Sequence, residues 1–289
     1  MRITRRLASR SILAVAVTSS FLLAGCGTES NGSAAQKAQT NPYGLIDAGT
    51  IRAATQLDHP PFEYGSPSGK PIGFIVDVTD EAAKRMKLKV DYKSTTVPAG
   101  LAGLTSHQYD LAAMGLGITE EREKSVDFTK PLFWSSTVVL TTKDSNLSGL
   151  DAFAGKKVGA VTGSSQEVFV DQKMPTARAI SFPGENSGIN QLMNGSLDAF
   201  VVGGPSAEHF MKAHADLRDA ASAAVDHPTS MAVSKNHRAL LAALDKQITA
   251  MVHDGTYARL YRKWFTTKPL PQLVQAWPEL ATQFKVAAP

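Results

Sequence analysis

Residues 157–202 read KVGAVTGSSQEVFVDQKMPTARAISFPGENSGINQLMNGSLDAFVV. Short apolar runs typical of strands lie at 157–161, 179–182 and 199–202, and the intervening segments 165–172 and 189–193 have helical patterns. Strands that alternate with helices in this way predict a parallel sheet with helices on its faces. This stretch therefore indicates an α/β fold.

The same alternation occurs earlier in the chain, so the βα pattern is present twice, with a break near residues 131–136. The earlier series comprises expected strands at 51–54, 88–92 and 111–114 and expected helices at 77–86 and 99–106, and a further strand is expected at 138–142. Residues 238–264 have apolar side chains close to the helical period. Gly255 interrupts this segment, so one helix and two helices fit it equally well.

The charge of the chain depends on its first 25 residues. The chain has 30 Lys and Arg against 26 Asp and Glu, and four of the arginines precede residue 26. Subtracting them leaves 26 basic against 26 acidic residues, a neutral remainder. The basic footprint of a nucleic-acid-binding protein is therefore missing. A hydrophobic content of 43% also excludes a disordered chain.

Residues 1–25 have the parts of an export signal: basic residues, then an apolar run, then small residues. The run is too short for a permanent membrane span. Leu23-Ala24-Gly25-Cys26 resembles the lipobox of bacterial lipoproteins, which implies cleavage before Cys26 and a lipid on its sulfur. Cys26 is the only cysteine, so no disulfide is expected. General secretion is favoured over twin-arginine export, because the twin-arginine match ends at Thr4-Arg5-Arg6-Leu7.

Residues 26–42 are small and polar, and we interpret them as a flexible tether between the lipid and the folded part. The folded part contains none of the common short motifs of hydrolases, nucleotide-binding enzymes or zinc sites, and its seven histidines show no ligand spacing. No metal and no cofactor is predicted, and the chain is not expected to be an enzyme.

Several short stretches resemble the extracytoplasmic solute-binding proteins of ABC importers, in the branch that binds polar amino acids (solute-binding protein family 3). In chain order they are HPPFEY (59–64), GFIVDV (73–78), YD (109–110), ITEER (118–122), VDFT (126–129), VGAVTGSS (158–165) and DGTY (254–257) with KWF (263–265). Each stretch is weak alone, but seven in the family's order are specific, and they span about residues 49–265.

The resemblance implies two Rossmann-like α/β lobes joined by two hinge strands, the fold of periplasmic binding proteins of type II. We expect residues 43–133 to form the first part of lobe 1, 134–230 to form lobe 2, and 231–289 to return to lobe 1 and form a C-terminal tail. The crossing strands are expected near 132–136 and 229–233. The tail from residue 266 is expected to wrap the first lobe.

Arg122 is the leading candidate for ligand binding. Its planar fork can meet a carboxylate through two parallel hydrogen bonds, and the arginine at this place in the resembled family holds the ligand's α-carboxylate. The second anchor is the strand-to-helix turn with Thr162, Ser164 and Ser165, because N–H groups at a helix N-terminus form an anion site. An ordinary helix cap is the alternative there. Since the two anchors belong to different lobes, a carboxylate bound by both would hold the lobes closed.

Three departures from the family pattern concern the rest of the site. Gly117 stands where the family has a hydroxyl. Gly203 stands where the family has the aspartate that pairs with the ligand's α-amino group. Gln56 stands where an acid is frequent, and His59 and Val97 stand where the family often has aromatic rings.

Two alternatives follow from these departures. Either another acid such as Asp58 or Glu185 meets the amino group, or the solute is not an ordinary α-amino acid, because a buried ammonium without a counter-charge is costly. The glycines at 115, 117, 203 and 204 are expected to leave room for a bulkier ligand; tight turns with positive φ are the other interpretation. Gly115 and Gly203 are included among the candidate binding residues.

The resulting hypothesis is a monomeric, lipid-anchored extracytoplasmic receptor on the outer face of the cytoplasmic membrane or in the periplasm. It would deliver a small carboxylated solute, an amino acid or an amino-acid-like compound, to an ABC permease. The alternative is a dehydratase-type enzyme on the same scaffold that acts on a cyclic carboxylate such as prephenate. That chemistry needs an acid or base beside the carboxylate anchor, and His59 is the obvious candidate.

Overall fold

The computed structural model describes residues 40–224 and 227–287. The expected leader at 1–25, the expected lipidation site Cys26 and all but the end of the expected tether at 26–42 lie outside the described residues. Within the described ranges, none of the helices has both the length and the apolar character needed to cross a bilayer.

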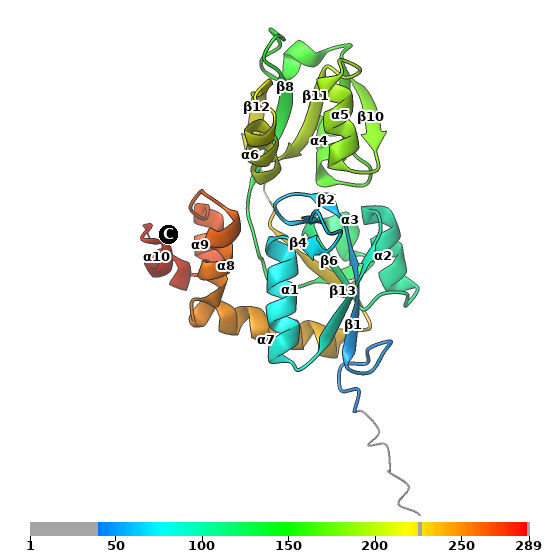
Figure 1. Ribbon diagram of the computed structural model, residues 1–289, viewed down its shortest axis with the longest axis vertical. Coiled ribbons are helices and arrows are strands. Elements are labelled where there is room, and N and C mark those ends of the chain that lie inside the picture. The colour runs from blue at the N-terminus through cyan, green and yellow to red at the C-terminus, as the bar shows by residue number, and fades with distance from the viewer. Residues whose placement is uncertain (1–39, 225–226, 288–289) are drawn as a thin grey trace, which may run out of the picture. The chain divides into compact units, whose positions relative to one another are not determined.

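The fold has two α/β lobes, each built around its own five-stranded sheet (Figure 1). The sheet of the first lobe has the order β5-β1-β6-β13-β7. Its strands are β1 (Thr50–Thr55), β5 (Lys89–Ser94), β6 (Leu111–Gly117), β7 (Val126–Phe128) and β13 (Thr229–Ser234). Strand β1 is parallel to β5 and β6, whereas β13 is antiparallel to β6 and β7.

The sheet of the second lobe has the order β10-β9-β11-β8-β12. Its strands are β8 (Ser136–Thr142), β9 (Lys157–Val161), β10 (Arg178–Phe182), β11 (Ala199–Gly203) and β12 (Leu217–Ala224). Strand β9 is parallel to β10 and β11, but β8 is antiparallel to β11 and β12. Both sheets are thus mixed rather than parallel throughout, because each contains a strand that joins it to the other lobe and runs in the opposite direction.

The helices flank these sheets. They are α1 (Phe74–Arg85), α2 (Val97–Thr105), α3 (Glu120–Glu123), α4 (Ser165–Lys173), α5 (Glu185–Met193), α6 (Gly204–Ala213), α7 (Arg238–His253), α8 (Thr256–Trp264), α9 (Pro271–Ala276) and α10 (Glu279–Phe284). The long apolar segment forms two helices, because Gly255 adopts a left-handed φ of 78° between α7 and α8. Helix α5 begins four residues before the predicted start at Ile189, since its first turn is polar and shows no apolar period.

A small antiparallel sheet that the sequence pattern did not predict lies in the first lobe. It consists of β2 (Asp58–His59), β3 (Glu63–Gly65) and β4 (Pro71–Ile72). These strands are too short for a period-two pattern to be recognised. They matter for the site because they contain His59 and Glu63.

The chain crosses between the lobes twice, after β7 and before β13. The first crossing lies between Phe128 and Ser136 and includes most of the expected range 132–136. The expected second range, 229–233, was placed too late, because those residues form β13 inside the first sheet. The first crossing pairs with the start of β13 through an antiparallel bridge between Phe133 and Thr229.

One large hydrophobic core fills the first lobe and includes the C-terminal tail. Leu273, Trp277 and Leu280 of the tail are buried in the same cluster as α1, α7 and α8. The indole Nε1 of Trp277 donates to the backbone oxygen of Pro131 at 2.8 Å. The tail therefore packs against the start of the first crossing.

Candidate functional site

Side chains and backbone from both lobes line a cavity of about 30 Å³, which has space for only a few water molecules. The lining residues include Gln56, His59, Val97, Gly115, Leu116, Gly117 and Arg122 from the first lobe and Val161, Ser164, Ser165, Gln166, Glu185 and Val201 from the second. A neighbouring cavity of about 50 Å³ shares His59, Gly115, Gly117, Ser165 and Gln166 with it. The two cavities are adjacent parts of one space between the lobes.

Arg122 lies on the short helix α3, which Thr119 caps by accepting a hydrogen bond from the Arg122 N–H at 3.3 Å. Its guanidinium donates to the backbone oxygen of Gly117 at 2.6 Å and to that of Gly163, in the other lobe, at 2.7 Å. No carboxylate among the described residues lies within ion-pair distance of this guanidinium. Burial alone lowers the pKa of Arg122 to about 10, because no anion compensates the lost hydration.

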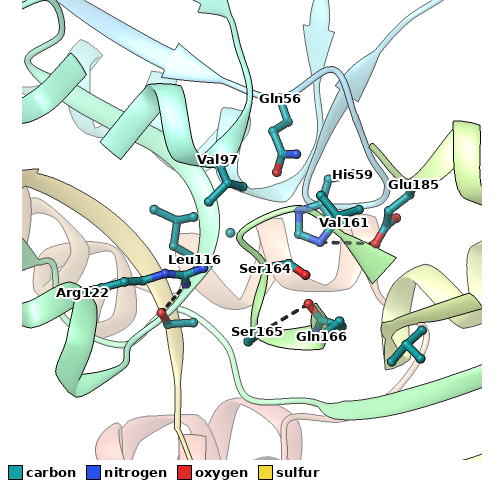
Figure 2. A pocket seen from close by; sticks show the side chains of 13 residues that line it. Gln56, His59, Val97, Leu116, Arg122, Val161, Ser164, Ser165, Gln166 and Glu185 are labelled. Atoms are coloured by element: carbon teal, nitrogen blue, oxygen red, sulfur yellow. Dashed lines mark hydrogen bonds and ion pairs between the residues drawn. The ribbon is translucent and has the colours of Figure 1, made fainter. Parts of the chain in front are cut away.

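The turn between β9 and α4 faces Arg122 (Figure 2). Ser164 is the N-cap of α4 and accepts from the N–H of Glu167 at 3.1 Å. The N–H groups of Ser165 and Gln166 have no hydrogen-bond partner among the described residues. Free N–H groups at a helix N-terminus attract anions, so this turn and Arg122 offer donors to a negatively charged group from two sides.

His59 is held by a buried carboxylate. Glu63 is fully buried and accepts from the backbone N–H of Gly115 at 3.0 Å, while its Oε1 lies 2.7 Å from Nδ1 of His59. Burial opposes the charged form of His59, but the carboxylates of Glu63 and Glu185 outweigh it and raise the pKa to about 9. His59 is therefore a protonated imidazole near neutral pH, with Nε2 directed toward Glu185.

Glu185 is the first residue of α5 and is 5% exposed. Its Oε1 lies 4.0 Å from Nε2 of His59, and its Oε2 is buried without a hydrogen-bond partner among the described residues. Burial raises the pKa of Glu185 to about 8, against the opposing charge of His59. The carboxyl group thus faces the cavity with an unsatisfied oxygen.

The structure brings most of the predicted site residues to this space. Gln56, His59, Gly115, Gly117, Arg122, Ser164 and Ser165 line the first cavity, and Gly203 lines the second. Thr162 is the exception, since it lines neither cavity. It is exposed, and its hydroxyl donates to the backbone oxygen of Phe182 at 3.0 Å, which turns it toward β10.

The expectation that four glycines leave room for a bulky ligand is wrong for three of them. A Cβ on Gly117 would lie 2.6 Å from the ring of His227, one on Gly115 would lie 3.2 Å from His59, and one on Gly204 would lie 2.8 Å from Ser136. Only Gly203 is open, with Gln166 Nε2 as the nearest atom at 4.0 Å. The turn interpretation fails as well, because none of the four has a positive φ.

Sequence reasoning did not predict Gln166, His227 or Glu63 as parts of the site, and it named Glu185 only as an alternative. No apolar period marks these residues, although Gln166 directly follows the predicted turn and Glu63 is only four residues from His59, whereas His227 meets Gly117 from far along the chain. The structure places the two alternative acids differently. Glu185 lines the cavity. Asp58 lies against Gly184, just before α5, where a Cβ would be 1.7 Å from its Oδ2.

The sequence model of the family described as bacterial extracellular solute-binding proteins, family 3, matches residues 51–267. The chain is 27% identical over 270 residues to the ABC transporter glutamine-binding protein GlnH of Bacillus subtilis (strain 168), which covers 90% of this chain and 99% of that protein. The match thus includes nearly the whole relative.

Solved structures give the same result. An ancestral arginine-binding protein bound to arginine superposes with a TM-score of 0.72 at 31% identity, covering 75% of this chain and 98% of that one. The ancestral amino acid-binding protein AncCDT-1, described as a precursor of cyclohexadienyl dehydratase, has a TM-score of 0.69 at 28% identity, covering 75% and 96%.

Proposed function

The chain belongs to the bacterial extracellular solute-binding proteins, family 3, and from this membership we propose that it delivers a small carboxylated solute, an amino acid or an amino-acid-like compound, to an ABC permease. Two of the relatives named above are a glutamine-binding protein of an ABC transporter and an arginine-binding protein, and the third is described as an amino acid-binding protein. The proposal extends their role to this chain.

The observation that carries this proposal is the environment of Arg122. A half-buried guanidinium that lines a cavity without a carboxylate partner is energetically unfavourable until an anion arrives. The free N–H groups of Ser165 and Gln166 add donors from the second lobe. A ligand carboxylate would satisfy both sets at once.

Binding from two lobes explains how a solute would be signalled to a permease. Arg122 already contacts Gly163 across the lobes, and Ser206 donates to the backbone oxygen of Pro60 at 2.7 Å. Because the cavity between them is small, a solute enters only when the lobes separate and is enclosed when they approach again. The closed form is then the state that the permease recognises.

The cellular location is part of the same proposal. Residues 1–25 act as a cleaved lipoprotein signal, Cys26 carries the lipid, and 26–42 tether a monomeric two-lobed receptor to the outer face of the cytoplasmic membrane or within the periplasm. The proposed lobe assignment is the expected division into 43–133, 134–230 and 231–289, except that residues 229 and 230 move to lobe 1, because they belong to β13. The support is the residue pattern of the leader and the extracellular role in the family description.

The test begins with a thermal-shift screen of the chain from residue 27 onward against amino acids, betaines, opines and simple organic acids, because a tight ligand raises the melting temperature. Calorimetry on the strongest ligand then compares wild type with Arg122→Ala. We expect a loss of at least about 100-fold in affinity, since the ligand carboxylate would be left without its charged partner.

Arg218→Ala is the matched control. The Arg218 guanidinium also donates to backbone carbonyls, those of Ser145 and Leu147 at 2.7 Å each and that of Asp219 at 3.2 Å, but it lines neither cavity between the lobes. Its removal should leave affinity unchanged. Equal affinities for Arg122→Ala and wild type would contradict the proposed site.

A dehydratase is the second candidate function, favoured by the raised pKa of Glu185 in the cavity that Arg122 also lines. A carboxyl group with a pKa of about 8 retains its proton near neutral pH and can protonate the hydroxyl of a cyclic carboxylate, which leaves as water while the ring carboxylate leaves as CO2 and its bonding pair completes the ring double bonds. The resemblance to a precursor of a dehydratase supports this candidate. Prephenate is the test substrate: turnover that Glu185→Gln abolishes would replace the transport role, and absence of turnover would remove the candidate.

A further inference from the structure

The cavity contains one carboxyl group whose hydrogen bonds are incomplete. Oε2 of Glu185 is buried and lacks a partner among the described residues, and Oε1 lies 4.0 Å from His59 Nε2, which is too far for a hydrogen bond. Buried polar atoms nearly always have a partner, so a lone carboxylate oxygen in a binding cavity indicates that a ligand supplies it.

The neighbours of Glu185 cannot complete these bonds. His59 is fixed through Nδ1 by Glu63, and Glu63 in turn is fixed by the Gly115 N–H. The Ser206 hydroxyl donates to the backbone oxygen of Pro60. Ser206 does lie near the Glu185 carboxyl group, but its single hydroxyl hydrogen is donated to Pro60, and Nε2 of His59 is 4.0 Å away.

Glu185 is also the only carboxylate among the described residues that line the two cavities. At Gly203, where the family has an aspartate for the α-amino group, no side chain is present, and the atom nearest to where a Cβ would stand is an amide nitrogen of Gln166. A cationic group of the solute would thus find its acceptor at Glu185 rather than at residue 203.

Arg122 and Glu185 lie on opposite sides of the cavity, with Ser164 and Ser165 between them (Figure 2). Burial disfavours the charged form of each, lowering the pKa of Arg122 to about 10 and raising that of Glu185 to about 8. A solute with a negative group at one end and a positive group at the other would restore both charges.

We propose, on the basis of the proposed function, that Glu185 accepts a cationic N–H group of the solute at the end of the cavity away from Arg122. The solute class is then a carboxylate whose cationic nitrogen is separated from the carboxylate carbon by several bonds, an ω-amino or ω-guanidino acid. An α-ammonium contributes little, because it would lie beside Arg122 and Gly203, where no carboxylate lines the cavities.

The experiment measures calorimetric affinities of the chain from residue 27 onward for five probes. They are 4-guanidinobutanoate and 5-aminopentanoate, which have a distal cation and no α-amino group; L-norvaline, which has only the α-amino group; pentanoate, which has no nitrogen; and glutarate, which has a second carboxylate. We expect at least one distal-cation probe to bind tenfold or more tightly than L-norvaline and glutarate.

Glu185→Gln should weaken binding of the distal-cation probes by about 10- to 100-fold, because one charge-assisted hydrogen bond is lost, while affinity for pentanoate changes less than about twofold. Glu185→Asp should restore part of the loss. Asp171→Asn, which removes an exposed carboxylate from α4, is the matched control and should have no effect. Melting temperatures establish that each variant is folded.

The proposal is overturned if Glu185→Gln binds the distal-cation probes as wild type does, if neither of these probes binds wild type, or if L-norvaline or glutarate binds more tightly. These results leave the proposed function intact as long as Arg122→Ala abolishes binding of whichever solute the screen identifies. If Arg122→Ala retains that binding, the proposed function fails independently.

Discussion

The Nη2 of Arg122 lies 2.7 Å from the backbone oxygen of Gly163, so the proposed carboxylate anchor of the first lobe contacts the anion-binding turn of the second directly. The same guanidinium donates to Gly117 O within its own lobe. One side chain therefore links the strand β6, the helix α3 and the turn before α4.

Gly163→Ala is expected to weaken solute binding by about tenfold or more. Gly163 has a φ of 70°, and a Cβ there would lie 2.8 Å from Pro98 Cγ in the first lobe, so the substitution should oppose closure as well as strain the turn. Gly195→Ala is the control, since Gly195 has a φ of 77° in the same lobe but no atom near its Cβ position. Calorimetry should show reduced affinity for Gly163→Ala only; equal effects of both variants would contradict a specific role in closure.

Gly203→Asp is expected to create affinity for the α-amino group. The position is open and its φ of −69° suits any residue, so an aspartate fits beside the cavity. We expect Gly203→Asp to bind L-norvaline about tenfold or more tightly than wild type does. Gly117→Ser, by contrast, would place Cβ 2.6 Å from the His227 ring and should lower the melting temperature. Unchanged L-norvaline affinity in Gly203→Asp would show that residue 203 does not face the amino group.

Glu63→Gln is expected to destabilise the fold by about 3 kcal/mol, because it leaves the buried His59 without its main counter-charge. Removing both partners in a His59→Asn, Glu63→Gln double variant should recover part of this loss, since no unpaired charge then remains. Urea unfolding measures both. If the double variant loses more free energy of unfolding than the two single variants lose together, this pairing is contradicted.

The stability of the ligand-free protein is expected to fall as the pH rises from about 4.5, the unfolded-state value of Glu185, to about 9, the folded-state value of His59. The folded-state pKa of His59 is raised to about 9 from 6.5 and that of Glu185 to about 8 from 4.5, so the folded state binds both protons more tightly than the unfolded state. Each group therefore contributes fully to the free energy of unfolding below its unfolded-state pKa, and this contribution is lost as the pH rises through the folded-state pKa.

Besides each other, the titratable groups that act on His59 and Glu185 are Asp58 and Glu63. Melting temperatures recorded across this pH range should decline in wild type and decline less in a His59→Asn, Glu185→Gln double variant. A wild-type melting temperature that rises toward pH 9 would contradict the raised pKa values, because these predict a decrease.

Cys26→Ser is expected to release the exported protein from the membrane fraction without changing solute affinity, because the proposed lipid anchor lies outside the two-lobed fold. Fractionation of cells that produce the full chain, followed by immunoblotting, measures this. A Ser20→Ala variant, altered within the leader but not at the lipobox, should remain with the membrane. Membrane retention of Cys26→Ser would remove the lipid-anchor proposal.

Most strands and helices of the two large sheets could be predicted from the sequence, because apolar periodicity is a local property of about 5 to 20 residues. The short strand of His59 and the helix that begins at Gly204 could not, since neither has a sufficient apolar pattern. The mixed direction of the sheets was also missed, because strand direction depends on how the chain returns from the other lobe.

The sequence by itself determined the α/β class, and it singled out Arg122 and the turn at 162–165 as anion-binding candidates, because these depend on residue type and local order. Only the tertiary structure decided that Glu185 rather than Asp58 lines the cavity, that His227 occupies the space beside Gly117, and that Thr162 faces away. These outcomes depend on contacts between lobes and between residues far apart in the chain, and no local pattern of apolar and polar residues contains that information.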